Sequence, residues 1–174
     1  KYKNLVIRAG TNPRFTGNMQ IQGILYVEAP NNIEFRGNVD LYGFIVVENS
    51  GSPSNNILDF KGNVTPYALP STPEFDTLRA TTGVSILAPT TAISMSGSSG
   101  GSALTGSIIG GTFSFTGAAN LQIDRGSLIT YANDRDSTTI NGSKTIRFTA
   151  PGKNNQPNVG MSYSVYFAPV PSSY

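Results

Sequence analysis

Hydrophobic and polar residues alternate along short stretches of the chain, a pattern typical of strands with one face turned toward a core. In residues 15–22 (FTGNMQIQ), apolar or small residues occupy the odd positions and polar residues the even ones. Many of the apolar residues are β-branched or aromatic, types that favour strands. No stretch combines a cap with the 3.6-residue period of a long helix, and only residues 74–81 favour a short turn or helix. We therefore expect an all-β protein.

The alternating stretches recur with a period of twenty residues. Residues 15–28 (FTGNMQIQGILYVE) align without a gap on residues 35–48 (FRGNVDLYGFIVVE). Their shared opening, an apolar residue followed two places later by glycine, occurs six times in the chain, at Phe15, Phe35, Phe60, Met95, Phe115 and Ile140. Two of the spacings, Phe35 to Phe60 and Phe115 to Ile140, are five residues longer than the period, and a third, Phe60 to Met95, contains a Pro/Thr-rich segment that breaks the repeat. The additional residues of the first two spacings fall in loop-like segments around 50–56 and 133–137.

A period of this length predicts a single-stranded parallel β-helix, also called a β-solenoid. Twenty residues are too few for a strand-helix-strand unit but fit three short strands and three bends, which make one rung. Rungs stack about 4.8 Å apart, so equivalent residues lie above one another. Right-handed winding is the default expectation. We expect the solenoid over residues 1–149, with a Pro/Thr-rich excursion at about 65–91, and an irregular tail over residues 150–174 with a strand-like segment at 161–167.

Stacking predicts partners for several polar residues. Arg8 precedes Glu28 by one full repeat, and Arg14 precedes Glu34 by the same interval, so each pair is expected to form a salt bridge between adjacent rungs. Three asparagines occupy the same position of successive repeats and predict a structural ladder at a bend, formed by Asn18, Asn38 and Asn63.

Composition excludes several classes of active site. The chain has no Cys, His or Trp, which rules out a disulfide framework, a thiolate nucleophile, a Ser-His-Asp triad and metal sites built from Cys or His. Asp124, Asp134 and Asp136 with Asn133 offer oxygen ligands for calcium, but their spacing matches neither an EF-hand nor a glycine-rich calcium repeat, so we expect a solvated loop, no metal and no cofactor.

Charge and hydropathy limit the partners and the location. The net charge is +2, from 12 basic and 10 acidic residues spread along the chain, which does not favour a nucleic-acid binder. No apolar run approaches the ~18 residues that a membrane helix needs, so no membrane span is expected. Charged residues make up only 13% of the chain. This polar, charge-poor and Cys-free composition favours an extracellular or cell-surface protein in mature form over a cytosolic one.

Two stacked carboxylates, Glu28 and Glu48, are the runner-up candidates for catalysis. One rung apart, they could approach the ~5 Å separation of a retaining glycosidase pair. Tyr26 and Tyr42 would then offer aromatic contacts for a polysaccharide, as in a lyase or a tailspike-like module. However, Arg8 falls in the same column and could neutralise the pair. We therefore expect no enzyme, and keep a carbohydrate-binding or carbohydrate-cleaving solenoid as the alternative.

The ends of a solenoid expose unpaired backbone groups that must be capped or used for assembly. Two segments are candidates for this interface. An incomplete first rung contributes Leu5, Val6 and Ile7, and the strand-like tail segment contributes Met161, Tyr163, Val165 and Phe167. The tail strand either caps its own rod or is donated to a neighbouring copy, and both remain open.

The repeated FxGNxxxxGxxxVE pattern resembles the short β-helical rungs of exported bacterial proteins. It is most similar to domains attached to type IV pilus assembly proteins of the PilX kind, and more distantly to the polymer-forming bactofilins. The resemblance covers about Leu5 to Phe148 and departs from the pattern at residues 65–91 and 150–174. It implies a surface or filament-associated structural role with copies of itself as partners, and it carries over no catalytic residues. An adhesin, or a protein that contacts surface polysaccharide, is the remaining alternative.

Overall fold

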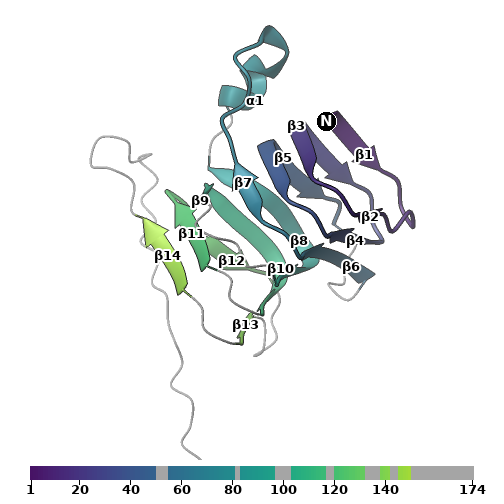
Figure 1. Cartoon of the computed structure of the whole chain (residues 1–174), viewed down its shortest axis with the longest axis vertical. Helices are drawn as coiled ribbons and strands as arrows, with labels where there is room; N and C mark the ends of the chain where they lie inside the picture. The colour runs from purple at the N-terminus through teal and green to yellow at the C-terminus, as the bar shows by residue number, and fades with distance from the viewer. Residues whose placement is uncertain are drawn as a thin grey trace, which may run out of the picture.

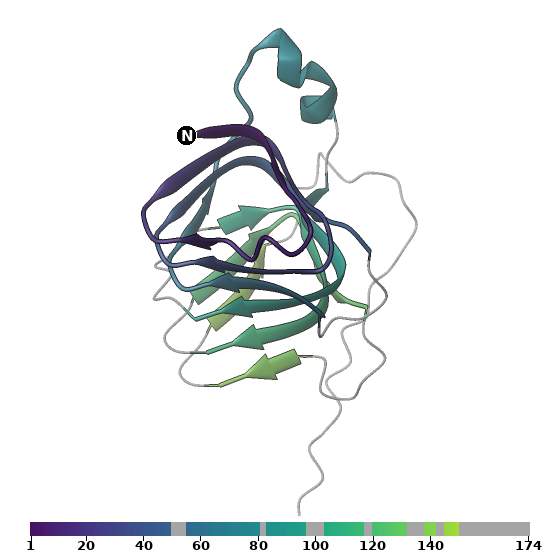
Figure 2. The same ribbon diagram turned by 90° about the vertical axis from the view of Figure 1, so that its right-hand side faces the viewer.

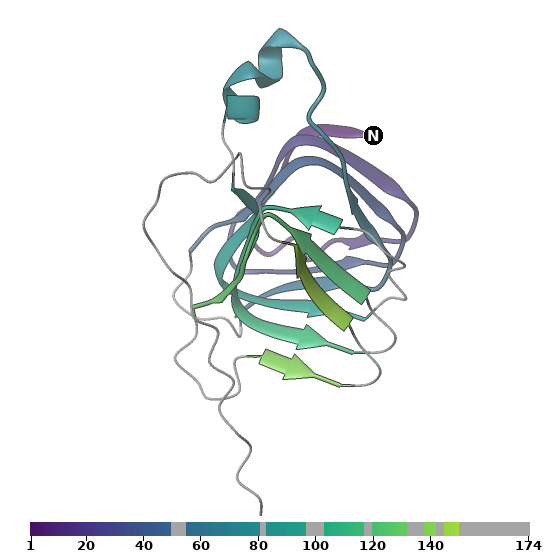
Figure 3. The ribbon, with the colours of Figure 1, turned by 90° about the vertical axis from the view of Figure 1, so that its left-hand side faces the viewer.

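The chain folds as a β-solenoid of about six rungs built mostly from parallel strands, as predicted. The structure is a computed structural model, and it describes residues 1–49, 55–80, 83–96, 103–116, 120–131, 138–141 and 145–149. The rod runs from the N-terminal strand at one end to β14 at the other (Figure 1). Viewed nearly along the rod from either end, the rungs superpose as a rounded triangle (Figures 2 and 3). We number the rungs from the N-terminus.

The rod has three faces, which we call face 1, face 2 and face 3 in the order in which the chain visits them. Face 1 holds the first part of β1 (Tyr2–Ile7), β3 (Met19–Val27) and β5 (Val39–Val47), then β7 (Val64–Pro66), β9 (Ala103–Thr105), β11 (Asn120–Asp124) and β14 (Thr145–Thr149). Face 2 holds the second part of β1, β3 and β5, the first part of β8 (Val84–Met95) and β10 (Ser107–Phe115), and β12 (Leu128–Thr130). Face 3 holds β2 (Arg14–Phe15), β4 (Asn31–Phe35), β6 (Asn56–Phe60), the second part of β8 and β10, and β13 (Thr138–Ile140).

The strand register confirms the repeat found in the sequence. On face 3, parallel pairing places the six apolar-x-Gly openings in one inward column, in the order Phe15, Phe35, Phe60, Met95, Phe115 and Ile140. The first three rings of this column stack, with centroids 5.3 Å and 4.8 Å apart. On face 1 the hydrogen-bonded pairing is interrupted between β7 and β9, so β9, β11 and β14 form a separate sheet.

The core is the interior of the triangle, and it is filled by aliphatic and aromatic side chains from all three faces. Buried residues alternate with partly exposed ones along β3 and β5, as the sequence predicts. Several core side chains are fully buried, among them Ile21, Leu25, Phe35, Ile45, Ile86 and Ile108. Burying a side chain of this size contributes about 1.5–3 kcal/mol, so the stacked interior is the main stabilising feature of the rod.

Glycine is required where the backbones of successive rungs approach closely at the corner between faces 1 and 2. Gly23 and Gly43 have φ angles of 83° and 148°, and a Cβ at Gly43 would overlap the Gly23 carbonyl. In the first rung Asn4 takes this position, with a φ of 46°. Its side-chain oxygen accepts a hydrogen bond of 3.1 Å from the N–H of Ile24, which ties the first rung to the second.

An excursion leaves the rod at this same corner, between β7 and β8. Its described part, residues 67–80, which we call the arm, contains the 3₁₀ turn η2 (Pro73–Phe75) and the short helix α1 (Asp76–Ala80), in line with the short helix expected at 74–81. The arm projects from one corner of the triangle (Figure 2). The expected end of the excursion at residue 91 is wrong, because strand β8 starts at Val84 and pairs with β5, β6 and β10.

Candidate functional site

Both ends of the rod present apolar side chains that no further rung covers within the described residues. At the N-terminal end, β1 is the last strand of its sheet. Tyr2 packs edge-on against Phe15 and is 42% exposed. At the C-terminal end, Ile140 and Phe148 are 49% and 51% exposed. Both continue inward columns, because they pair with the buried residues above them in the rod.

The structure separates the three residues expected to form the N-terminal part of an assembly interface. Leu5 points inward and is half-buried, and Val6 points outward and is 47% exposed. Ile7 is a core residue that is 5% exposed, so it can join a contact only through its backbone. The tail residues of that expected interface, Met161, Tyr163, Val165 and Phe167, lie outside the described residues.

The asparagine ladder lies at the corner between faces 3 and 1, where each rung turns after its apolar-x-Gly opening. The side-chain oxygen of Asn18 accepts a hydrogen bond of 3.0 Å from the N–H of Asn38. The side-chain oxygen of Asn38 in turn accepts one of 3.1 Å from the N–H of Asn63. The ladder therefore satisfies backbone donors at a bend where the strand pairing is interrupted.

A second asparagine column, buried at the corner between faces 2 and 3, was missed by the sequence reasoning. Asn31 is 2% exposed and Asn56 is 0% exposed. The oxygen of Asn56 accepts the N–H of Asn31 at 3.0 Å, and the amide group of Asn31 donates to the carbonyls of Arg8 and Glu28 at 2.9 Å and 2.6 Å. The signal was present, since Asn31 and Asn56 are separated by the same interval as Phe35 and Phe60.

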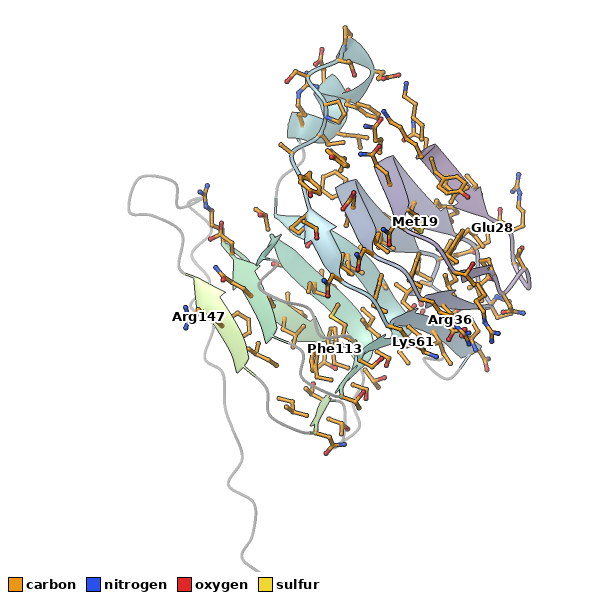
Figure 4. All side chains as sticks on the ribbon, viewed as in Figure 1. Met19, Glu28, Arg36, Lys61, Phe113 and Arg147 are labelled. Atoms are coloured by element: carbon orange, nitrogen blue, oxygen red, sulfur yellow. The ribbon has the colours of Figure 1, made fainter. Side chains whose placement is uncertain are left out.

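Glu34 is the centre of an ion cluster on the outer side of face 3. It pairs with Arg14, as predicted, and also with Arg36 and Lys61, which come from its own rung and the next. Arg36 and Lys61 lie together on the rod (Figure 4). Hydrogen bonds from Lys61 and Arg36 lower the pKa of the Glu34 carboxyl to about 2, and the same contact with Glu34 raises the pKa of Lys61. The cluster links three rungs through one carboxylate.

The stacked carboxylates Glu28 and Glu48 are occupied by bonds between rungs. Glu28 forms the predicted salt bridge with Arg8 and accepts the N–H of Ala9 at 3.2 Å. Glu48 accepts the N–H of Ala29 at 3.0 Å, so each carboxylate binds the backbone of the rung before it. The hydrogen bond from Arg8 lowers the pKa of Glu28, whereas a general acid in a glycosidase needs a raised pKa.

The two tyrosines that were suggested as polysaccharide contacts beside these carboxylates lie on different faces. Tyr26 points outward from face 2, and Tyr42 points outward from face 1, because the bends at Gly23 and Gly43 separate the two positions. Tyr42 instead stacks on Tyr67 of the arm, with ring centroids 4.6 Å apart. The structure therefore does not bring the candidate acids and aromatics together into one groove.

The arm is tied to the first rung by its 3₁₀ turn. Glu74 and Lys3 form a salt bridge of 2.5 Å, and the Lys3 ammonium lies 5.6 Å from the centre of the Phe75 ring. Phe75 is 1% exposed and lies close to Gly23 at the corner. The arm therefore packs against the rod at the corner between faces 1 and 2, where Gly23 lies.

Nothing in the described part of the chain gathers three or more potential metal-ligating acids. Asp124 lies 3.6 Å from its neighbour Arg125, while Asn133, Asp134 and Asp136 lie outside the described residues. Of the helices that the structure describes, none has the length and apolar character to cross a membrane.

No protein-family model, curated protein or solved structure matches the chain. The class that the structure defines is thus a β-solenoid.

Proposed function

We propose that this chain is a non-enzymatic structural subunit that assembles head to tail into filaments or fibres, at the cell surface or associated with a pilus. The observation that carries the proposal is the exposed interior at both ends of the rod. Phe148 and Ile140 at one end, and Tyr2 and Leu5 at the other, are apolar residues of inward columns. Stacking one rod on the next would remove these side chains from water.

Edge strands supply the second part of the contact. The outer edges of β1 and β14 carry backbone N–H and C=O groups that pair with no other described strand. Both strands lie on face 1, so β14 of one copy and β1 of the next can continue the same parallel sheet. Unequal ends of this kind form a heterologous interface, and because the copies stack along the rod axis, the interface repeats without closing and produces a filament.

The junction also predicts a place for the tail segment. Strand β14 occupies face 1 of a seventh rung, and no strand within the described residues completes that rung on faces 2 and 3. A continuous stack needs two more strands there. Residues 161–167, with alternating apolar side chains, have the pattern required to supply one of them to the junction. Placement outside the cell rests on the composition and on the resemblance to exported rungs.

Negative-stain electron microscopy over a concentration series tests the proposal. We expect filaments that lengthen with concentration for the parent chain, and their loss in Phe148→Asp, which places a charge on the exposed interior. The control is Arg147→Asp on the same strand, an outward residue at the C-terminal end of the rod (Figure 4). Removal of residues 162–174 should shorten the filaments. A parent chain that stays a single rod at every concentration would contradict the proposal.

A further inference from the structure

Face 2 carries a continuous stripe of apolar residues on its outer side, one in each rung. Strand pairing aligns these residues in a single column, which we call the outer stripe: Val6, Tyr26, Val46, Leu87, Ile109 and Ile129. Val6 and Leu87 are 47% and 39% exposed, and the other four are partly exposed. The outer stripe runs the full height of the six rungs and contains no charged residue.

The fold itself does not require apolar residues at outward positions. On face 3 the equivalent outward column is polar in every rung, and it consists of Arg14, Glu34, Asp59, Ser94, Ser114 and Thr139. On face 1, Gln20, Asp40 and Thr65 are likewise polar. The other outward column of face 3 carries Ile57 and Ala92 but has polar residues on either side of them, Asn32 and Thr112. The continuous apolar column therefore belongs to face 2, and a contiguous apolar surface is the usual mark of an interaction site.

We propose that the outer stripe is a lateral interface through which two copies of this chain pack face to face. Charge gives the first argument for a second copy as the partner. Beside the stripe, Glu28 is paired with Arg8, and Glu48 accepts a backbone hydrogen bond from Ala29. This column therefore holds one ion pair and one hydrogen-bonded carboxylate, which is too little net charge to select a strongly basic partner. Its regular spacing of about 4.8 Å per side chain matches another rod of the same rung height.

The area of the face gives the second argument. Six rungs at about 4.8 Å each and a strand of about four residues make a surface of roughly 29 Å by 13 Å, or about 400 Å². A stable complex buries about 800 Å² on each partner, so two single rods would pair only weakly. Two rods stacked end to end would double the area. Lateral pairing would therefore become stable as stacking proceeds, and in this respect the inference rests on the proposed function.

The test uses two substitutions in the same strand, β10. Ile109→Lys places a charge in the outer stripe, and the control Thr112→Lys places the same charge on face 3 of the same rung. We expect the parent chain and Thr112→Lys to form filaments two rods wide. Ile109→Lys should form filaments one rod wide, and should raise the concentration needed for paired filaments by about tenfold or more.

The outcomes separate this inference from the proposed function. Filaments one rod wide in the parent chain, or paired filaments that persist in Ile109→Lys, would overturn the lateral interface and leave head-to-tail assembly intact. Lateral dimers without filaments, broken by Ile109→Lys, would support the interface and contradict head-to-tail assembly. A third outcome would also overturn the inference. If the thiol of Ile109→Cys is protected from maleimide in the dilute single rod, another part of the same chain covers the outer stripe.

Discussion

The first three rungs and the last three share one backbone arrangement but connect their rungs with different side chains. The outward column of face 3 consists of Arg14, Glu34 and Asp59 in the first three rungs, and of Ser94, Ser114 and Thr139 in the last three. The asparagine ladder and the Glu34 cluster both belong to the first half. In the described part of the last three rungs, with the arm left aside, the one ion pair joins Asp124 to its sequence neighbour Arg125.

This difference shows which interactions define the rung and which reinforce it. Parallel pairing and the inward apolar column continue through both halves. In the described part of the second half, the side-chain bonds between rungs include neutral ones to the backbone, such as those of Ser107 and Thr130. The backbone pairing and the core therefore determine the register, and the polar ladders add stability to a register that already exists. We expect the first three rungs to be more stable than the last three, and we expect a few identifiable residues to provide the additional stability.

The largest effect is expected where the backbones of the first half nearly touch. Gly37→Ala would place a methyl group against the Gly17 carbonyl, which cannot move without shifting the rung before it. We expect the free energy of unfolding to fall by about 3 kcal/mol or more, at the upper end for overpacking. The matched control is Gly17→Ala, whose methyl group meets no neighbour within 4 Å and should change stability by less than about 1 kcal/mol. Urea unfolding measures both, and equal losses would show that the close contact between rungs is not required.

The next effect should separate the buried asparagine column from the exposed ladder. Asn31→Ala removes the groups that bind two carbonyls and the N–H of Asn12 inside the rod. We expect a loss of about 2–3 kcal/mol, because the Glu28 carbonyl and the Asn12 N–H lose the partner that the buried side chain provides, while the Arg8 carbonyl still accepts from Thr11. Asn18→Ala removes one hydrogen bond at an exposed corner and should cost about 1 kcal/mol. An Asn18→Ala variant less stable than Asn31→Ala would contradict this ranking of the two columns.

A smaller effect concerns pH and the Glu34 cluster. The pKa of Glu34 is about 2 in the folded rod, against an ordinary value of 4.5. Because the folded value is the lower one, the carboxylate stabilises the fold above pH 4.5, and this contribution is lost as the pH falls from 4.5 toward 2. The thermal midpoint should therefore fall more steeply over that range in the parent chain than in Glu34→Gln. Asp124→Asn in the second half is the control, and it should retain the parent slope.

The smallest effect is expected at the exposed salt bridge between Arg8 and Glu28. The Arg8 side chain is 78% exposed, so solvent and salt screen its charge. Arg8→Gln should leave the thermal midpoint within the scatter of surface substitutions, at low and at high salt. A clear loss at low salt that disappears at high salt would show that exposed charge pairs contribute more to the first half than we infer.

The fold was predictable because its signal is repeated. Six apolar-x-Gly openings predicted the column on face 3, and the interval of one repeat predicted the Arg8–Glu28 and Arg14–Glu34 pairs. The end of the excursion was misplaced because Pro89 and the threonines beside it look like loop residues. They form the bend within β8, where Thr91 is buried.

The surface was harder to predict, because inside and outside cannot be told apart in a continuous apolar run. Residues 24–27 (ILYV) and 44–47 (FIVV) are apolar at every position, so alternation does not reveal which side chains face solvent. The outer stripe therefore became visible only in the structure. Two of the three partners of Glu34 were missed because neither lies at the repeat spacing: Arg36 follows two residues later in the same rung, and Lys61 meets Glu34 diagonally from the next rung.

Head-to-tail stacking is tested most directly by cross-linking two single-cysteine variants, since the natural chain contains no Cys. Thr16→Cys and Asn141→Cys place exposed thiols in one outward column of face 3, in the first and sixth rungs. Across a junction with a completed seventh rung they would lie about 10 Å apart, within reach of a bismaleimide, whereas within one chain they are about 24 Å apart. Head-to-tail assembly predicts a cross-linked pair only when the two variants are mixed. No product in the mixture, or a product from Thr16→Cys alone, would contradict it.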